Sequence, residues 1–152
     1  MKVRVELIDD GSEDEIIIRC GRVDDTVHKI HQYIKDLSEQ NLQIDLYKDN
    51  EEFYFSVEDI LFFETEQESV YAHTIQDSYL IKHRLYELEK MLPGYFIRSS
   101  KSTIINSKQV YSITRNLTAS SLVTFKNTHK RVYVSRNYYS QLRQLLRKEY
   151  IK

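Results

Sequence analysis

Apolar and polar residues alternate along most of the chain, which is the pattern of half-buried β-strands. The first two alternating stretches, residues 3–7 and 15–20, flank a polar turn and predict a β-hairpin. A period of three and four residues follows and predicts a helix that starts near Asp24. The apolar stripe of this helix consists of Val27, Ile30, Ile34 and Leu37.

Short strands are predicted for most of the remaining chain, beginning with the alternation over residues 42–48. A second helix over residues 84–92 ends at Pro93-Gly94, because proline cannot continue a helix and glycine tolerates a left-handed cap. A last helix starts after Ser135, the predicted cap. Eight or nine strands and three helices predict a β-rich α+β fold.

The composition indicates a folded protein that is adapted to a reducing compartment. Hydrophobic residues make up 41% of the 152 residues, and 12 Tyr and 6 Phe supply aromatic volume for a core. The single cysteine, Cys20, excludes an internal disulfide framework. Because no apolar run approaches the roughly 18 residues of a membrane span, we expect a cytoplasmic protein.

Charge is distributed unevenly along the chain, although the formal net charge is only −1. Residues 93–152 contain 12 Lys or Arg against one Asp or Glu, whereas residues 51–92 contain 3 against 10. Residues 1–50 are also acidic, with 7 against 12. A basic segment of this kind predicts an anionic partner, either nucleic acid or an acidic protein.

Catalytic and cofactor chemistry is poorly represented. Three glycines are too few for a phosphate-cradling loop or a dinucleotide fingerprint, and Cys20 has no second cysteine with which to form a metal cluster. Glu64, Glu66 and Glu68 alternate at the end of a predicted strand and are expected to form a solvated face. We therefore expect no enzymatic activity, no cofactor and no metal.

The stretch FIRSSKSTIIN, residues 96–106, combines a polar centre with apolar ends. Its centre, residues 98–103, is cationic and rich in hydroxyls without one acid. The apolar ends predict strand residues that hold this centre outward. Arginine can fork two phosphate oxygens, lysine acts as a point charge, and short hydroxyls donate without crowding a phosphate backbone. The stretch therefore favours contact with a sugar-phosphate chain; a charged exposed edge is the structural alternative.

Four segments in order resemble the LytTR family of bacterial DNA-binding domains. They lie in VEDILFFETEQESVYAHT (57–74), in RLYELEKMLPGYFIRSSKSTIINSKQVYSI (84–113) and in VYVSRNYYSQL (132–142). The second stretch holds two of the four segments, the helix ending in Leu-Pro and FIRSSKSTIIN (96–106). The resemblance implies a mainly β domain over residues 44–152, preceded by a hairpin-and-helix extension over residues 1–43. It also implies a transcription regulator whose loops enter successive major grooves and bend the duplex at direct-repeat promoter sites, usually as pairs of molecules.

Residue roles follow from the same resemblance. The family's three base-reading positions fall at Ser69–Val70, Lys101 and Arg136. The positions that hold or flank DNA-backbone contacts fall at Arg98, Ser100, Ser102, Ser135 and Asn137. The first reading position lacks the histidine of well-known members, and Lys101 replaces an asparagine; both changes bear on the preferred sequence.

Several alternatives remain open. The acidic extension, residues 1–43, can dimerise or pack on the β domain, and stand-alone family members are commonly encoded beside a small membrane protein that restrains them. Arg115, Lys126, Lys130 and Lys108 are expected to be diffuse steering charges, and Asn106 is expected to be structural. The competing interpretation of the basic face is a protein-interaction module that docks an acidic partner.

Overall fold

The computed structural model describes residues 1–7, 15–38 and 42–150 and divides the chain into two compact units, Met1–Gln40 and Asn41–Lys152. The first unit contains helix α1 (Asp25–Ser38), which confirms the predicted first helix. The backbone N–H of Val27 donates to Oδ1 of Asp24 at 3.0 Å, a contact that satisfies one of the free amides at the helix start.

The predicted N-terminal hairpin is wrong for the described residues, because residues 1–7 and 15–20 are not strands. Their apolar side chains are exposed except for that of Ile18, which is half-buried, and 91% of Val3 and 96% of Leu7 are accessible to solvent. An isolated two-stranded hairpin is marginally stable in water, and it needs another strand or a helix to cover its apolar face. Alternation in the sequence does not supply that cover.

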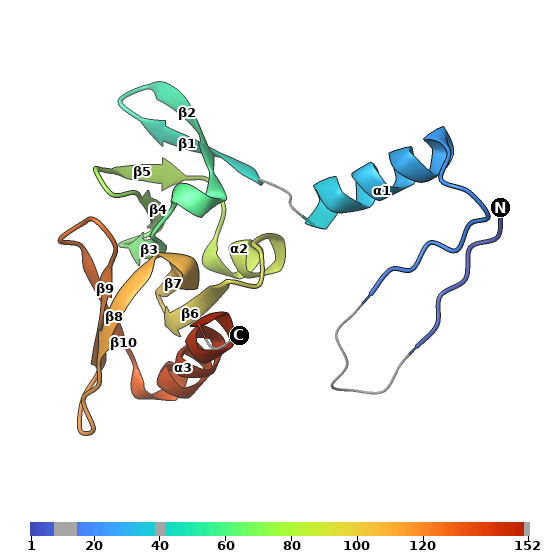
Figure 1. The fold of residues 1–152 in the computed structure, drawn as a ribbon. Helices are drawn as coiled ribbons and strands as arrows, with labels where there is room; N and C mark the ends of the chain where they lie inside the picture. The colour runs from blue at the N-terminus through green and yellow to red at the C-terminus, as the bar shows by residue number, and fades with distance from the viewer. Residues whose placement is uncertain (8–14, 39–41, 151–152) are drawn as a thin grey trace. The chain divides into compact units, whose positions relative to one another are not determined.

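Two antiparallel sheets and two helices form the second unit (Figure 1), which confirms the predicted β-rich α+β class. Sheet A has the strand order β2-β1-β5-β4-β3-β7-β6, and sheet B has the order β10-β9-β8. The helices are α2 (Leu85–Met91) and α3 (Arg136–Tyr150). The strands are β1 (Gln43–Lys48), β2 (Glu51–Ser56), β3 (Phe62–Glu66), β4 (Ser69–His73), β5 (Ser78–Ile81), β6 (Phe96–Ser100), β7 (Thr103–Asn106), β8 (Val110–Thr114), β9 (Ser121–Phe125) and β10 (Arg131–Val134).

Strands β3 and β7 are buried on both faces. Phe63 and Ile104 point into the first core, which β1, β4, β5 and α2 also line. Their neighbours Phe62 and Ile105 point into the second core, which sheet B and α3 complete. Because successive side chains of a strand point to opposite faces, one apolar pair on each strand serves both cores. This strand pair joins the two layers of the unit.

Asn106 at the end of β7 has the structural role that the sequence predicts. Its side chain is fully buried and its Nδ2 donates to the carbonyl oxygen of Ile60 at 2.9 Å and to that of Glu58 at 3.2 Å. Its Oδ1 accepts the N–H of Lys108 at 3.0 Å. These bonds satisfy backbone groups in a segment that forms no regular sheet contact. In the described ranges, no helix is both long enough and apolar enough to cross a membrane.

The β4–β5 and β9–β10 turns meet at one end of the sheets, which we call the distal end. Nζ of Lys130 donates to the carbonyl oxygen of Asp77 at 2.7 Å, and Oγ1 of Thr128 donates to that of Ile75 at 3.4 Å. His73 lies beneath this junction and stacks on Phe62 with ring centroids 4.2 Å apart. Burial, with a smaller effect of Lys130, lowers the pKa of His73 to about 4.

The two-sided strand pair predicts a large stability effect for Phe63, whose side chain is fully buried. Phe63→Ala is expected to lower the free energy of unfolding by about 3–5 kcal/mol, through lost burial and a cavity. Urea unfolding followed by circular dichroism measures the change. Tyr111→Ala, at a side chain that is 76% exposed, is the control and is expected to change it by about 0.5 kcal/mol or less. Equal effects of the two substitutions would contradict this assignment of the core.

His73 predicts a pH dependence of stability. Its folded pKa of about 4 lies below its ordinary value of 6.5, so the unfolded chain binds a proton that the folded protein excludes. Stability should therefore fall as the pH drops from 6.5 to 4. His73→Phe keeps the stacking on Phe62 and should remove part of this loss, while His129→Phe, at an exposed histidine, should not. Parallel pH profiles of all three proteins would show that His73 does not contribute.

Candidate nucleic-acid interface

Three chain segments meet at the end of the sheets opposite the distal end, which we call the reading end. They are the β3–β4 turn, the β6–β7 turn and the junction between β10 and α3. The backbone N–H of Thr65 donates to the carbonyl oxygen of Ser102 at 2.8 Å, which joins the first segment to the second. The N–H of Ser135 donates to the carbonyl oxygen of Ser99 at 2.9 Å, which joins the third to the second. The structure thus brings together the three regions that carry the predicted base-reading positions.

A β-bulge in β6 permits this approach. The pairing of β6 with β7 shifts register between Arg98 and Ser100, so Ser99 is the additional residue. Ser99 is fully buried, and its Oγ has no hydrogen-bond partner among the described residues. A small side chain at this position allows the β10–α3 junction to lie against β6. A bulge also re-aims the side chains that follow it, here those of the β6–β7 turn.

The β3–β4 turn presents a different set of side chains from the predicted one. Ser69 is half-buried at the start of β4, and Val70 is only 7% exposed and packs in the first core. The exposed tip consists of Glu66, Gln67 and Glu68, with Gln67 in the left-handed region at φ 56°. Val70 therefore faces the core, as the alternation along β4 requires.

The β6–β7 turn exposes Lys101 and Ser102, and Ser100 is half-buried beside them. Oγ of Ser100 accepts the N–H of Ser102 at 3.2 Å and lies 3.3 Å from Oγ of Ser102. Lys101 forms no ion pair with any described residue, so its ammonium is available to an anion. The two serines shape the turn and still present hydroxyls at its surface.

Arg98 is more enclosed than a free phosphate-binding arginine. Its side chain is 18% exposed; Nε donates to Oε1 of Glu89 at 2.6 Å, and Nη1 donates to the carbonyl oxygen of Lys101 at 2.6 Å. Two of the five guanidinium donors thus already have partners in the protein. The predicted DNA-backbone contact of Arg98 stays a prediction, but its visible role is to hold the β6–β7 turn.

The β10–α3 junction presents Arg136 and Asn137, which are both exposed, with Ser135 half-buried before them. The N–H of Tyr138 donates to the carbonyl oxygen of Ser135 at 3.0 Å, the first bond of α3. The amides that precede it at the helix start have no partner within the helix, and such a site favours a phosphate. Arg136 pairs with no described carboxylate, so it adds an available positive charge there.

A run of basic residues that sequence reasoning passed over also lies at the reading end. Lys82, His83 and Arg84 connect β5 to α2 and line, with Ser69 and Lys101, a cavity of about 510 Å³. The net acidic charge of residues 51–92 concealed this run. The signal for it in the sequence is three consecutive basic side chains directly before a helix.

The predicted steering charges divide between the two ends. Arg115 lies over the ring of Tyr139 on α3 at 5.1 Å, near the reading end. The other three lie toward the distal end. Lys108 is in η2 (Ser107–Gln109), which follows the end of β7 that is far from the β6–β7 turn. Lys126 and Lys130 are in the β9–β10 turn at the distal end. Lys108 also lies 4.0 Å from Oε1 of Glu58 and over the ring of Tyr95. Its expected contribution to DNA attraction is therefore smaller than the sequence implied.

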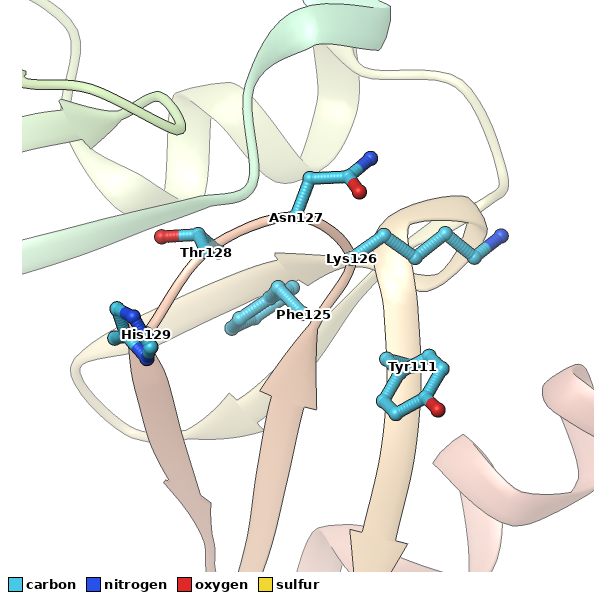
Figure 2. A pocket seen from close by; sticks show the side chains of 6 residues that line it. All are labelled: Tyr111, Phe125, Lys126, Asn127, Thr128 and His129. Carbon is cyan, nitrogen blue, oxygen red and sulfur yellow. The ribbon is translucent and has the colours of Figure 1, made fainter.

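A second cavity, of about 670 Å³, lies at the β9–β10 turn (Figure 2). Figure 2 shows the ring of Phe125 beneath the turn and Tyr111 on the neighbouring strand, with the side chains of Lys126 and Asn127 spread around the rim. The cavity belongs to the distal end and shares no lining residue with the reading end. Among the described residues no group of three or more His, Cys, Asp or Glu is placed to hold a metal ion.

Comparison with known proteins points to one family. The family model described as LytTr DNA-binding domain matches residues 50–147. Proteins named as uncharacterized HTH-type transcriptional regulators from Staphylococcus aureus strains NCTC 8325 / PS 47 and COL are each 30% identical over 146 residues, covering 96% of this chain and 98% of the relative. A solved LytTr DNA-binding domain of a putative methyl-accepting/DNA response regulator from Bacillus cereus matches with a TM-score of 0.63 and 26% identity. That match covers 68% of this chain and 95% of the solved chain.

Proposed function

The chain belongs to the LytTr family of DNA-binding domains, and from this premise we propose that it is a sequence-specific transcription regulator that reads direct-repeat promoter sites. In this proposal the β3–β4 turn, the β6–β7 turn and the start of α3 enter successive major grooves. The observation that carries the proposal is the pair of main-chain hydrogen bonds that holds these three segments together at one end of the sheets.

Base contacts are assigned to the exposed side chains of these segments. Arg136 is suited to a bidentate contact with a guanine edge, and Lys101 to a guanine or a phosphate. Ser69 contributes a hydroxyl at the first turn, where Gln67 is the exposed neighbour suited to adenine. We leave Val70 out of the contact set because it is buried.

Backbone contacts are assigned to the serines of the β6–β7 turn and to the start of α3. Ser100, Ser102, Ser135 and Asn137 can donate to phosphate oxygens, and the free amides at the start of α3 favour the same partner. Lys82 and Arg84 extend this cationic surface. If about six cations meet phosphates, the logarithm of the affinity should fall with the logarithm of the salt concentration with a slope near −5.

The relatives carry HTH in their names, but this chain supports a different reading mode. In the described part of the chain, strands separate each helix from the next, so these residues form no helix-turn-helix unit. Turns at strand ends are the elements that project at the reading end. The major groove is wide enough to admit them, as it admits a β-ribbon.

We propose that residues 1–43 form an extension that pairs two copies, and that residues 44–152 form the DNA-binding domain. The stripe of α1 falls at positions a and d of two successive heptads, with Val27 and Ile34 at a and Ile30 at d. Two heptads are marginal for association on their own. Pairing should therefore be strongest on DNA, where neighbouring repeats raise the effective concentration. We also propose that this acidic extension is the part of the chain that binds a small membrane protein, which restrains the regulator.

Arg136→Ala tests the reading assignment. It should reduce the preference for a selected direct-repeat site over scrambled DNA by about 1–3 kcal/mol, because a bidentate base contact is lost. Fluorescence anisotropy with both duplexes measures the preference. Arg131→Ala is the matched control, since Arg131 is an exposed arginine at the other end of β10. It should leave the preference unchanged.

Two results would contradict the proposal in different ways. Equal affinity of the unmodified protein for the selected and the scrambled duplex would favour the alternative, a basic face that docks an acidic protein. Loss of preference in both Arg131→Ala and Arg136→Ala would show that net charge, and not the reading end, determines it.

Ile34→Asp tests the pairing role of α1. A charge at an a position should abolish cooperative binding to a two-repeat duplex and leave the affinity for a single repeat unchanged. His28→Asp is the control, because His28 is an exposed residue of the same helix outside the stripe. Band-shift titrations on one-repeat and two-repeat duplexes give both quantities. Undiminished cooperativity in Ile34→Asp would refute pairing through α1.

A further inference from the structure

The β6–β7 hairpin has a turn that does not by itself match the twist of its strands. Ser100 pairs with Thr103, so Lys101 and Ser102 form a two-residue loop. Neither has positive φ, whereas the turns that fit the right-handed twist of two-residue hairpins require it. The β1–β2 hairpin meets that requirement, with Asp49 and Asn50 at φ 51° and 62°. The loop that carries Lys101 therefore depends on hydrogen bonds from outside itself.

Three contacts supply that support. Thr65 donates to the carbonyl oxygen of Ser102, and Ser100 accepts the N–H of Ser102. The third is the bond from Nη1 of Arg98 to the carbonyl oxygen of Lys101, the residue that we assign to base contact. Of the three bonds, this one is made by a long side chain, and that side chain must be held in place to donate to the turn.

Glu89 on α2 holds that side chain. Its Oε1 accepts Nε of Arg98 at 2.6 Å, and Arg98 is only 18% exposed while Glu89 is 44% exposed. A charge-assisted bond at this distance, partly shielded from solvent, restricts the guanidinium to one orientation. The planar fork of arginine then aims Nη1 at the turn. Leu85 and Leu88 are buried in the first core and fix α2, so the support is anchored to the core.

We propose that Glu89 is a positioning residue for sequence reading: through Arg98 it holds the Lys101 turn in the conformation that meets the base edges. Glu89 itself touches no DNA. This inference rests on the proposed DNA-reading function and deepens it. It also assigns Arg98 to support of the turn, in place of a phosphate contact.

The proposal opposes the expectation from simple electrostatics. A carboxylate near a DNA surface repels phosphates, so its removal ordinarily strengthens binding to every duplex. If Glu89 positions the turn, its removal instead weakens binding to the selected site and leaves binding to scrambled DNA unchanged or stronger. The discriminating quantity is the ratio of the two affinities.

The experiment compares four variants of the full chain with the unmodified protein, by anisotropy on the selected and the scrambled duplex. Glu89→Ala should lower the affinity ratio on the order of fivefold or more, in the range of one lost base contact. Glu89→Gln keeps an oxygen that can accept Nε of Arg98, so it should restore most of the ratio. Arg98→Lys keeps the charge but lacks the fork that joins both partners, so it should lower the ratio as Glu89→Ala does. Asp45→Ala removes an exposed acid on β1 and controls for charge alone.

A spectroscopic signature separates positioning from a general loss of structure. In the DNA-free protein, the amide resonances of Lys101 and Ser102 and the Nε–H resonance of Arg98 should shift in Glu89→Ala and remain near their places in Glu89→Gln. Amides of the distal end should not move. Thermal unfolding should show both variants folded, because Glu89 is partly exposed.

Different results refute the positioning role of Glu89 and the proposed DNA-reading function. If Glu89→Ala raises the affinity for both duplexes equally, as we expect for Asp45→Ala, then Glu89 only repels phosphates and the positioning role is refuted. The positioning role is also refuted if Arg98→Lys keeps the full ratio of affinities for the selected and the scrambled duplex. An unmodified protein that does not distinguish the two duplexes refutes the proposed function itself, before any variant is considered.

Discussion

The burial of β3 and β7 on both faces is the constraint on which the rest of the second unit depends. Phe62 and Phe63 are consecutive, as are Ile104 and Ile105, and each pair sends one side chain to each core. A shift of one residue in either strand would exchange the faces of its apolar residues, so the register is strongly specified. Since register determines where each strand ends, the same packing determines which turns meet at the reading end.

The reading end is therefore a product of the sheets and not of any single motif. Its three segments come from positions separated by some thirty residues or more of chain, and each is the end of a strand whose other residues are in a core. The main-chain bonds at Ser102 and Ser99 then close the remaining gaps between them. Such a construction gives a surface made of strand-end turns and the start of one helix. One of these turns, at Lys101 and Ser102, does not match the twist of its strands; Arg98 bonds to it directly, and Glu89 bonds to Arg98.

Local patterns predicted the secondary structure well wherever a second element covers the apolar face. The strands from β1 onward and all three helices follow periodicity, and Pro93-Gly94 marks the end of α2. The same alternation failed at residues 1–7, where no described strand covers it. The sequence was a poorer guide to which residues the fold brings close together. Sequence could not show that Lys108 lies toward the distal end, that Arg98 pairs with Glu89, or that Lys82 joins the surface of Lys101. The burial of Val70, in contrast, follows from strand parity alone.

The two bonds that join the reading segments use peptide N–H and C=O groups, and every residue except proline carries both. The side chains of Lys101, Ser69 and Arg136 take no part in those bonds. In the proposed function, mutation at these positions therefore changes the DNA sequence that is preferred and leaves the two main-chain bonds intact. Under that proposal, a lineage with this scaffold acquires new operators by single substitutions in one turn at a time, and gene duplication yields paralogues that share a backbone and control different promoters.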